Sequence, residues 1–198
     1  MTRWEWGHAG RPIPTELHSG DQVTVQEGDE RLFAAVIDGL GHGPGAHRAA
    51  QAILVGLEDS LSRPLEEALR KAHRQALATR GAAVSAVVVD TRVDRLTWAG
   101  VGNVEGVLLN PGEPVRERLL VQGGIVGQRL PRRLRIATLP IRRGDVLVLG
   151  TDGLASAFTD DPVLRSGRHP RDLARSLLET HGKRTDDAMV WVLRYRGG

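Results

Sequence analysis

Four aspartates stand beside small or flexible residues at the ends of predicted β-strands: Asp21, Asp38, Asp152 and Asp186. Asp38 comes directly after the apolar run 32–37, and Asp152 comes shortly after the apolar run 146–149. A glycine follows each of these two, so the chain can turn away and leave the carboxylate accessible. Mg²⁺ and Mn²⁺ prefer oxygen ligands, and one carboxylate can bridge two ions. The four aspartates together therefore predict a divalent-metal site.

The same residues allow other interpretations. An Asp-Gly pair is an ordinary turn, and we interpret Asp29 and Asp145 as turn residues. The glycine-rich segment 39–45 could instead hold a nucleotide phosphate. However, Pro44 stands where a dinucleotide-binding fingerprint needs its third glycine, and the Gly-Lys pair at 182–183 is followed by arginine rather than serine or threonine. Both observations disfavour a nucleotide site.

The elements that must position the aspartates follow from the hydrophobic pattern. Turn residues and β-rich runs predict strands at 22–27, 31–37, 83–90, 95–101, 104–109, 115–120, 134–139, 145–149 and 187–195. Helical spacing predicts helices around 49–57, from Pro64 to a stop at Gly81, at 154–158 and at 172–180. Helices grouped between runs of antiparallel-looking strands indicate an α+β fold. Two packed sheets with helices outside would bury apolar runs such as 86–89 on both faces.

Composition places the chain among globular proteins, since 40% of its 198 residues are apolar. We expect one domain that spans residues 1–198. The absence of cysteine excludes a disulfide framework, a thiolate metal site and a cysteine-phosphatase mechanism. The N-terminus has no apolar signal region and no stretch approaches 18 apolar residues, so we expect a cytoplasmic protein that does not span a membrane.

The chain is arginine-rich, with 27 basic residues of which all but two are arginines, a net charge of +3 and a pI near 10.1. A nucleic-acid binder would gather this charge on one face, but acidic residues are scattered among the arginines. One local excess holds no acid: Arg129, Arg132, Arg133, Arg135, Arg142 and Arg143. This segment is either a solvated surface or a docking surface for an acidic or phosphorylated partner, with Arg132 and Arg133 as candidate contacts. We expect no nucleic-acid partner.

The ordered motifs resemble those of the PPM-type metal-dependent Ser/Thr protein phosphatases. The resemblance rests on Gly20-Asp21, on Asp38-Gly39-Leu40-Gly41-His42-Gly43, on Thr151-Asp152-Gly153 and on Asp186-Asp187, and it spans residues 19–196. The Asp-Gly-x-Gly-His-Gly form is similar to the bacterial branch that regulates sporulation and sigma factors. Val101-Gly102-Asn103-Val104 and the compact length are similar to the stressosome phosphatases of that branch.

The resemblance implies a four-layer αββα sandwich of two mainly antiparallel sheets, without a flap subdomain. It implies two Mn²⁺ or Mg²⁺ ions, with Asp38 bridging both and the Gly39 carbonyl binding one of them. Asp152 and Asp186 would complete one ion, and Asp21 would serve the other. A water shared by the two ions would then hydrolyse phosphoserine or phosphothreonine, on phosphorylated STAS-domain proteins of a stressosome.

Two departures from the family pattern affect substrate binding. Leu40 replaces a histidine that many relatives carry as a candidate acid, so His42 is considered in its place. Residues 15–19 lack the phosphate-binding arginine common in relatives, so Arg11 or His18 would have to serve. The alternative functions are a catalytically silent docking module with a phosphatase fold and an arginine-rich nucleic-acid binder.

Overall fold

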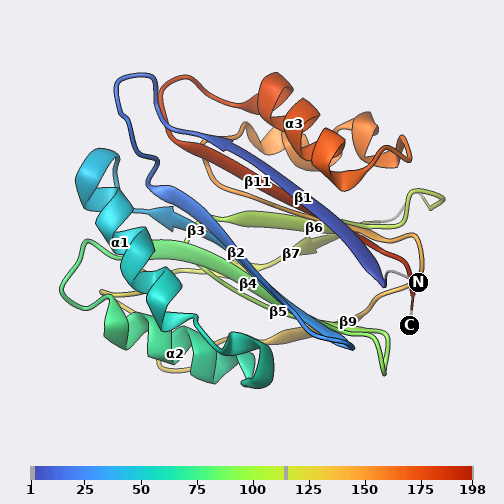
Figure 1. Ribbon diagram of the computed structural model, residues 1–198, viewed down its shortest axis with the longest axis horizontal. Helices are drawn as coiled ribbons and strands as arrows, with labels where there is room; N and C mark the ends of the chain where they lie inside the picture. Colours follow the sequence, from blue (N-terminus) through green and yellow to red (C-terminus); the bar gives the residue numbers. More distant parts are fainter. Residues whose placement is uncertain (1–2, 114–115, 198) are drawn as a thin grey trace.

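Two β-sheets pack face to face, and helices cover both outer faces (Figure 1). The computed structural model describes residues 3–113 and 116–197. The first sheet has the order β1 (Trp4–Arg11), β11 (Ala188–Tyr195), β10 (Val146–Gly150), β6 (Glu105–Leu109) and β7 (Arg116–Leu119). The second has the order β2 (Asp21–Glu27), β3 (Arg31–Gly39), β4 (Ala82–Asp90), β5 (Arg95–Val101) and β8 (Val121–Gln122), and β9 (Ala137–Pro140) also pairs with β5. Neighbouring strands are antiparallel except for the β5–β8 pair.

The helices form the two outer layers. Helices α1 (Gly43–Gly56) and α2 (Leu65–Gln75) cover the second sheet, and α3 (Pro170–His181) covers the first. Short 3₁₀ turns complete the chain at η1 (Ser60–Ser62), η2 (Ser156–Asp160) and η3 (Pro162–Arg165). The predicted αββα sandwich is therefore confirmed. Residues 154–185 form η2, η3 and α3 rather than a separate flap, as expected.

The near-continuous apolar strands bury both of their faces. In β3, Leu32, Ala34 and Val36 face the core between the sheets, whereas Phe33, Ala35 and Ile37 face the core under α1 and α2. In β11, Trp191 and Leu193 face the inter-sheet core and Val190 and Val192 face α3. Successive side chains of a strand point to opposite faces, so a strand between two apolar layers must be apolar throughout.

Strand β1 was missed by the sequence pattern. Its eight residues pair in register with β11, from Trp4 opposite Tyr195 to Arg11 opposite Ala188. Two glycines and two charged residues lower its apparent strand propensity. At Gly7 a Cβ atom would lie 2.4 Å from the Cα of Arg171, so α3 packs directly on the backbone of β1 there. Tertiary pairing and helix packing therefore define this strand.

Three predicted boundaries were wrong. Helix α2 ends at Gln75 rather than at Gly81, because Thr79 Oγ1 donates to the Ala76 carbonyl and Gly81, with φ +75°, turns the chain into β4. Residues 134–136 are loop rather than strand, because Leu134 packs in the core under α2. The helix expected at 154–158 is the 3₁₀ turn η2. Val115, the first residue of the strand predicted at 115–120, lies outside the described residues.

None of the helices in the described ranges has the length and hydropathy needed to cross a membrane.

Candidate metal centre

The strand order brings the four aspartates to one end of the sandwich, and we call this set (Asp21, Asp38, Asp152 and Asp186) the acidic site. Asp21 begins β2 and is the antiparallel partner of Asp38 near the end of β3. Asp152 follows β10 and Asp186 precedes β11, which pairs with β10 in the other sheet. The Thr151 hydroxyl joins the sheets by donating to Asp21 Oδ2 at 2.6 Å. Residues that are far apart in the sequence thus become neighbours.

Burial and mutual repulsion make the acidic site electrostatically costly. Burial, together with the charges of Asp187, Asp186 and Asp152, raises the pKa of Asp21 to about 7 despite the hydrogen bond from Thr151. Burial and the charges of Asp21, Asp152 and Asp186 raise the pKa of Asp38 to about 9, and a hydrogen-bonding contact with Asp152 adds to this. Burial and the neighbouring Asp152 also raise the pKa of Asp186. Each carboxylate would be ionised more easily beside a bound cation.

Three carboxylates of the acidic site, those of Asp21, Asp152 and Asp186, accept hydrogen bonds from neighbouring donors. Asp152 Oδ2 accepts from the Asn103 amide at 2.6 Å, and Asp186 Oδ1 accepts from the Asp187 backbone N–H at 2.9 Å. Within residues 3–113 and 116–197, no three acidic or histidine side chains converge on one point as the ligands of an ion would. Side-chain rotation would be needed to complete a coordination sphere.

The donor set fits hard divalent cations. Mg²⁺ and Mn²⁺ prefer oxygen ligands, and two types are present here. One is the clustered carboxylates, whose pKa values are raised, and the other is the adjacent backbone carbonyl of Gly39. At Gly39 a Cβ atom would lie 2.3 Å from the Ala46 carbonyl oxygen, so only glycine lets the first turns of α1 pack against the end of β3. The role of the Gly39 carbonyl as a ligand stays a prediction.

Asp187 has a structural role that the sequence did not show. Its side chain is 2% exposed, and its two oxygens accept from the backbone N–H groups of Ile13 and Gly20, both at 2.7 Å. These bonds tie the 12–20 loop to the start of β11 and hold Gly20 next to Asp21. The two adjacent aspartates therefore differ, since Asp186 faces the acidic site and Asp187 fixes the backbone around it.

Sequence reasoning also missed Thr151, Asn103 and Lys183 as neighbours of the aspartates. Lys183 Nζ donates to the Asp152 carbonyl oxygen at 2.6 Å, and its charge lowers the pKa of Asp186. Its backbone N–H donates to the Gly153 carbonyl at 2.8 Å, which fixes its position. The available signals were the Thr-Asp-Gly triplet and the rarity of lysine, since only two lysines occur in the chain and one lies three residues before Asp186.

The three side chains considered for substrate binding lie near the site but make other contacts. Arg11 donates to the Lys183 carbonyl oxygen at 2.6 Å and so supports the loop that leads to Asp186. His18 lies against the ring of His47, with centroids 5.2 Å apart. His42 Nδ1 lies 3.1 Å from Glu16 Oε1, and its side chain is 60% exposed. Substrate binding by Arg11, His18 and His42 stays a prediction.

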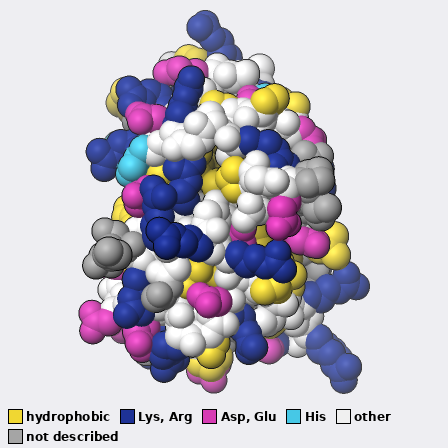
Figure 2. Space-filling model, turned by 90° about the vertical axis from the view of Figure 1, so that its right-hand side faces the viewer, with side chains coloured by type: hydrophobic (Ala, Val, Ile, Leu, Met, Phe, Trp, Pro, Cys, Tyr) yellow, Lys and Arg dark blue, Asp and Glu magenta, His cyan; other side chains and the backbone are white. Residues whose placement is uncertain are grey.

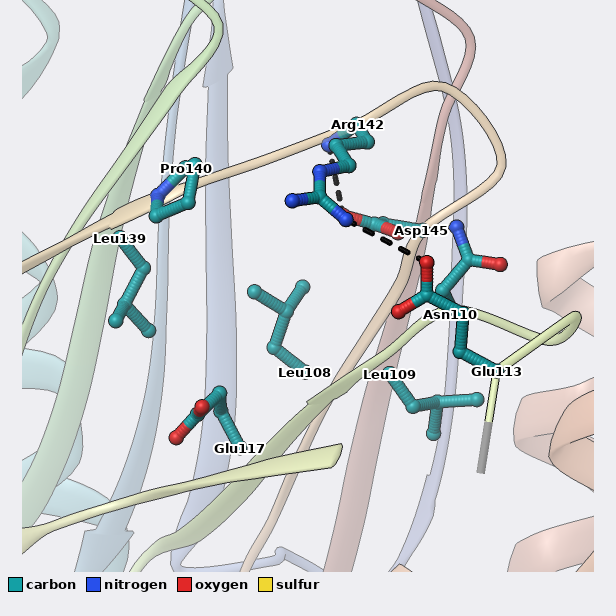
Figure 3. A pocket seen from close by; sticks show the side chains of 9 residues that line it. All are labelled: Leu108, Leu109, Asn110, Glu113, Glu117, Leu139, Pro140, Arg142 and Asp145. Atoms are coloured by element: carbon teal, nitrogen blue, oxygen red, sulfur yellow. Dashed lines mark hydrogen bonds and ion pairs between the residues drawn. The ribbon is translucent and has the colours of Figure 1, made fainter. Parts of the chain in front are cut away.

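A pocket lies at the end of the sandwich away from the acidic site (Figure 3). It has a volume of about 240 Å³ and opens between β6, β7 and β9, where Leu108 and Leu139 line it. Asp145, at its rim, accepts from the Arg142 N–H at 2.7 Å and from the Asn110 amide at 2.8 Å. Asp145 precedes β10 whereas Asp152 follows it, so this pocket is separate from the acidic site. The interpretation of Asp145 as a turn residue agrees with these contacts.

Two packed sheets flanked by helices, with the strand-end aspartates at one end, define a PP2C-type protein phosphatase domain. The family model described as Stage II sporulation protein E (SpoIIE) matches residues 28–196, and the chain belongs to this family.

Individual relatives agree with this assignment. The phosphoserine phosphatase RsbX of Bacillus subtilis (strain 168) is 27% identical over 178 residues, which cover 88% of this chain and 85% of that protein. A solved structure of RsbX in complex with magnesium has a TM-score of 0.85 at 23% identity and covers 97% of this chain and 95% of its own. A structure described under the bacterial stressosome, a modular system adapted to control secondary messenger signalling, has a TM-score of 0.87 at 30% identity, over 98% of this chain and all of its own.

The raised pKa values predict how stability depends on pH. A carboxyl whose pKa is higher in the folded state than its ordinary value of 3.8 keeps a proton that the unfolded chain releases. The free energy of unfolding must then fall as pH rises from about 4 through the folded-state values of about 7 and about 9. In EDTA we expect the melting temperature to fall between pH 6 and pH 9, as measured by differential scanning fluorimetry.

Divalent cations should reverse this trend, because they favour the ionised carboxylates. Mn²⁺ is expected to raise the melting temperature, and to raise it more at pH 8 than at pH 6. The matched control is Asp38→Asn, which removes the group with the larger pKa change and should flatten the pH dependence in EDTA. A melting temperature in EDTA that rises between pH 6 and pH 9 would contradict the assignment of buried, mutually repelling carboxyls.

Proposed function

We propose that this protein hydrolyses phosphoserine and phosphothreonine esters on regulatory proteins, with two divalent cations, Mn²⁺ or Mg²⁺, held at the acidic site. The observation that carries the proposal is the packing of Asp21 beside Asp38, with Asp152 in contact, at strand ends where their pKa values reach about 7 and about 9. Such a concentration of buried negative charge is unfavourable by itself and is favourable around cations. Membership of the SpoIIE family supports the same conclusion.

The roles of the residues follow from their positions. Asp38 and Asp152 would hold one ion with Asp186, and Asp38 and Asp21 would hold the other with the Gly39 carbonyl. When bound, two such ions act as Lewis acids that lower the pKa of water and neutralise charge on a phosphoryl group. Thr151 fixes the rotamer of Asp21, and Asn103 holds Asp152. Lys183, whose ammonium group already lies beside Asp152 and Asp186, can pair with a phosphoryl oxygen of the substrate.

The proposed substrates are phosphorylated STAS-domain proteins of a stressosome. Support comes from two relatives: RsbX, named a phosphoserine phosphatase, and the stressosome-related structure of nearly equal length. The proposed reaction is direct attack by water, and the absence of cysteine excludes a cysteinyl-phosphate intermediate. Residues other than those that act on the phosphate would recognise the protein part of the substrate.

The test is hydrolysis of a synthetic phosphoserine peptide, followed by release of inorganic phosphate. We expect phosphate release with Mn²⁺ or Mg²⁺ and none with EDTA. The same peptide with phosphotyrosine is the specificity control. Binding of the peptide without any metal-stimulated hydrolysis would contradict the proposal and would favour a docking module with a phosphatase fold.

A further inference from the structure

The segment between β8 and β9 exposes four arginines and contains no acidic residue. We call residues 123–136 the arginine loop. It carries Arg129, Arg132, Arg133 and Arg135, whose side chains are all exposed. The loop runs alongside α2 (Figure 1), where the Arg70 guanidinium donates to the Arg132 carbonyl at 2.6 Å.

The backbone of the arginine loop is held in place by several contacts. Ile125 and Arg129 exchange two backbone hydrogen bonds of 3.0 and 2.8 Å. Gln122 accepts from the Arg135 N–H at 2.5 Å, and its amide donates to the Arg133 carbonyl at 3.3 Å. Leu134 is 9% exposed and packs in the core under α2. The loop therefore presents its arginines from an ordered backbone, which reduces the entropy lost when a partner binds.

These four arginines differ from the ion-paired arginines of the chain in their lack of acidic partners. Several arginines elsewhere lie beside carboxylates, as in the pairs Arg92–Asp90 at 2.8 Å and Arg196–Glu5 at 2.6 Å. The face opposite the acidic site shows basic and acidic side chains side by side (Figure 2). Within residues 3–113 and 116–197, none of the four loop arginines forms an ion pair. Their charge is thus available to another molecule.

The structure separates the six arginines that the sequence grouped together. Arg142 and Arg143 lie on the turn between β9 and β10, at the end of the sandwich away from the acidic site, and Arg142 pairs with Glu113 at 3.4 Å. Only the four residues of the arginine loop share one surface. The turn arginines therefore provide an internal control with the same chemistry at a different place.

The arginine loop lies at the same end of the second sheet as Asp38. Val126 forms a bridge with Ala82 at the start of β4, and the next residue, Ala83, is the partner of Asp38. Neighbouring strands are about 4.8 Å apart, so the backbone of Val126 lies roughly 10 Å from that of Asp38. An extended peptide covers this distance in three to four residues, at about 3.3 Å each.

We propose that the arginine loop is the docking surface for an acidic segment of the phosphoprotein substrate, about four or more residues away from the phosphoserine that enters the acidic site. Arginine forms forked hydrogen bonds with carboxylates, so a fixed set of unpaired arginines recognises acidic side chains at a defined distance. This inference rests on the proposed phosphatase function and adds to it the chemical character of the partner surface.

The probes are two synthetic phosphoserine peptides with identical residues around the phosphoserine. One carries four Asp or Glu residues beginning four positions away, and the other carries Asn and Gln there. Wild-type protein with Mn²⁺ should hydrolyse the acidic peptide with a kcat/KM about tenfold higher, because several exposed ion pairs each contribute a modest factor. The preference should shrink between 50 and 200 mM NaCl, since salt screens exposed charges.

The variant is Arg132→Glu combined with Arg133→Glu, and the matched control is Arg142→Glu combined with Arg143→Glu. Both double changes alter the net charge equally. The loop variant should reverse the preference to favour the neutral peptide, whereas the control should keep it. Arg132→Gln with Arg133→Gln should give a ratio between those of the wild type and the Glu variant. Melting curves confirm that each variant is folded.

The outcomes distinguish this inference from the proposed function. Equal preference of the wild type for both peptides, or an equal change in both double variants, would overturn the docking surface while leaving the phosphatase function intact. Failure of the wild type to hydrolyse either peptide with Mn²⁺ would instead refute the phosphatase function itself.

Discussion

Replacing Asp38 with asparagine is expected to abolish metal-dependent phosphate release. Asp38 is the partner of Asp21 across two strands and is in contact with Asp152, so it is the carboxylate best placed to touch both ions. Asparagine keeps the shape of the side chain but removes its charge and one anionic ligand. We expect kcat to fall at least about 10³-fold, which corresponds to roughly 4 kcal/mol of transition-state stabilisation.

The fold should survive this change. Asparagine replaces a carboxyl whose ionisation is disfavoured by burial and repulsion, so the melting temperature in EDTA should be maintained or increased. The control is Asp29→Asn, which changes an aspartate in the turn between β2 and β3 at the other end of the sheet. Hydrolysis by Asp38→Asn within tenfold of the wild type, together with insensitivity to EDTA, would rule out the two-cation site.

Replacing Asp187 with alanine is expected to lower stability strongly. The change leaves the buried backbone N–H groups of Ile13 and Gly20 without their carboxylate acceptor. Hydrogen bonds to a charged group contribute about 1.5–3 kcal/mol each, so we expect a loss of about 3–6 kcal/mol in the free energy of unfolding. For a chain of this size that loss corresponds to a melting temperature lower by roughly 6–24 °C. Activity should fall as well, because the 12–20 loop positions Asp21.

The neighbouring residue provides the matched comparison. Asp186→Asn should remove activity without lowering the melting temperature in EDTA, because Asp186 accepts a bond only from the adjacent Asp187 N–H and its pKa is raised by its surroundings. Asp187→Asn should be intermediate in stability, since its amide oxygen can still accept one of the two bonds. If both aspartates affected stability equally, the separation of a ligand from a structural residue would be wrong.

Much of the fold could be predicted because strand periodicity is local. The apolar runs 32–37 and 146–149 are long enough to be buried on both faces, and this pattern already requires two layers of covering structure. Strand β1 could not be predicted, because Gly7 and Gly10 have weak strand propensity and the strand exists through its pairing with β11. The start of β9 also depends on a tertiary contact, the packing of Leu134 in the core under α2. The end of α2 involves a local hydrogen bond from Thr79 to the Ala76 carbonyl.

The sequence by itself determined the chemical character of the site. Aspartates at strand ends, an Asp-Gly pair after each of two buried strands and the absence of cysteine are local facts, and they indicate oxygen ligation of hard cations whatever the detailed packing. The α+β class and two packed sheets with helices outside also followed from the order and periodicity of the elements, and the family resemblance implied the four-layer αββα sandwich.

The tertiary structure decided which residues share a surface and which donor each one meets. It separated Asp186 from Asp187, placed Lys183 beside Asp152, and divided the arginines of residues 129–143 between two ends of the molecule. The site depends on contacts between residues far apart in the sequence, such as Thr151 with Asp21 and Gly20 with Asp187. Sequence spacing carries no information about such contacts, because the packing of two sheets sets the distances between side chains from different strands.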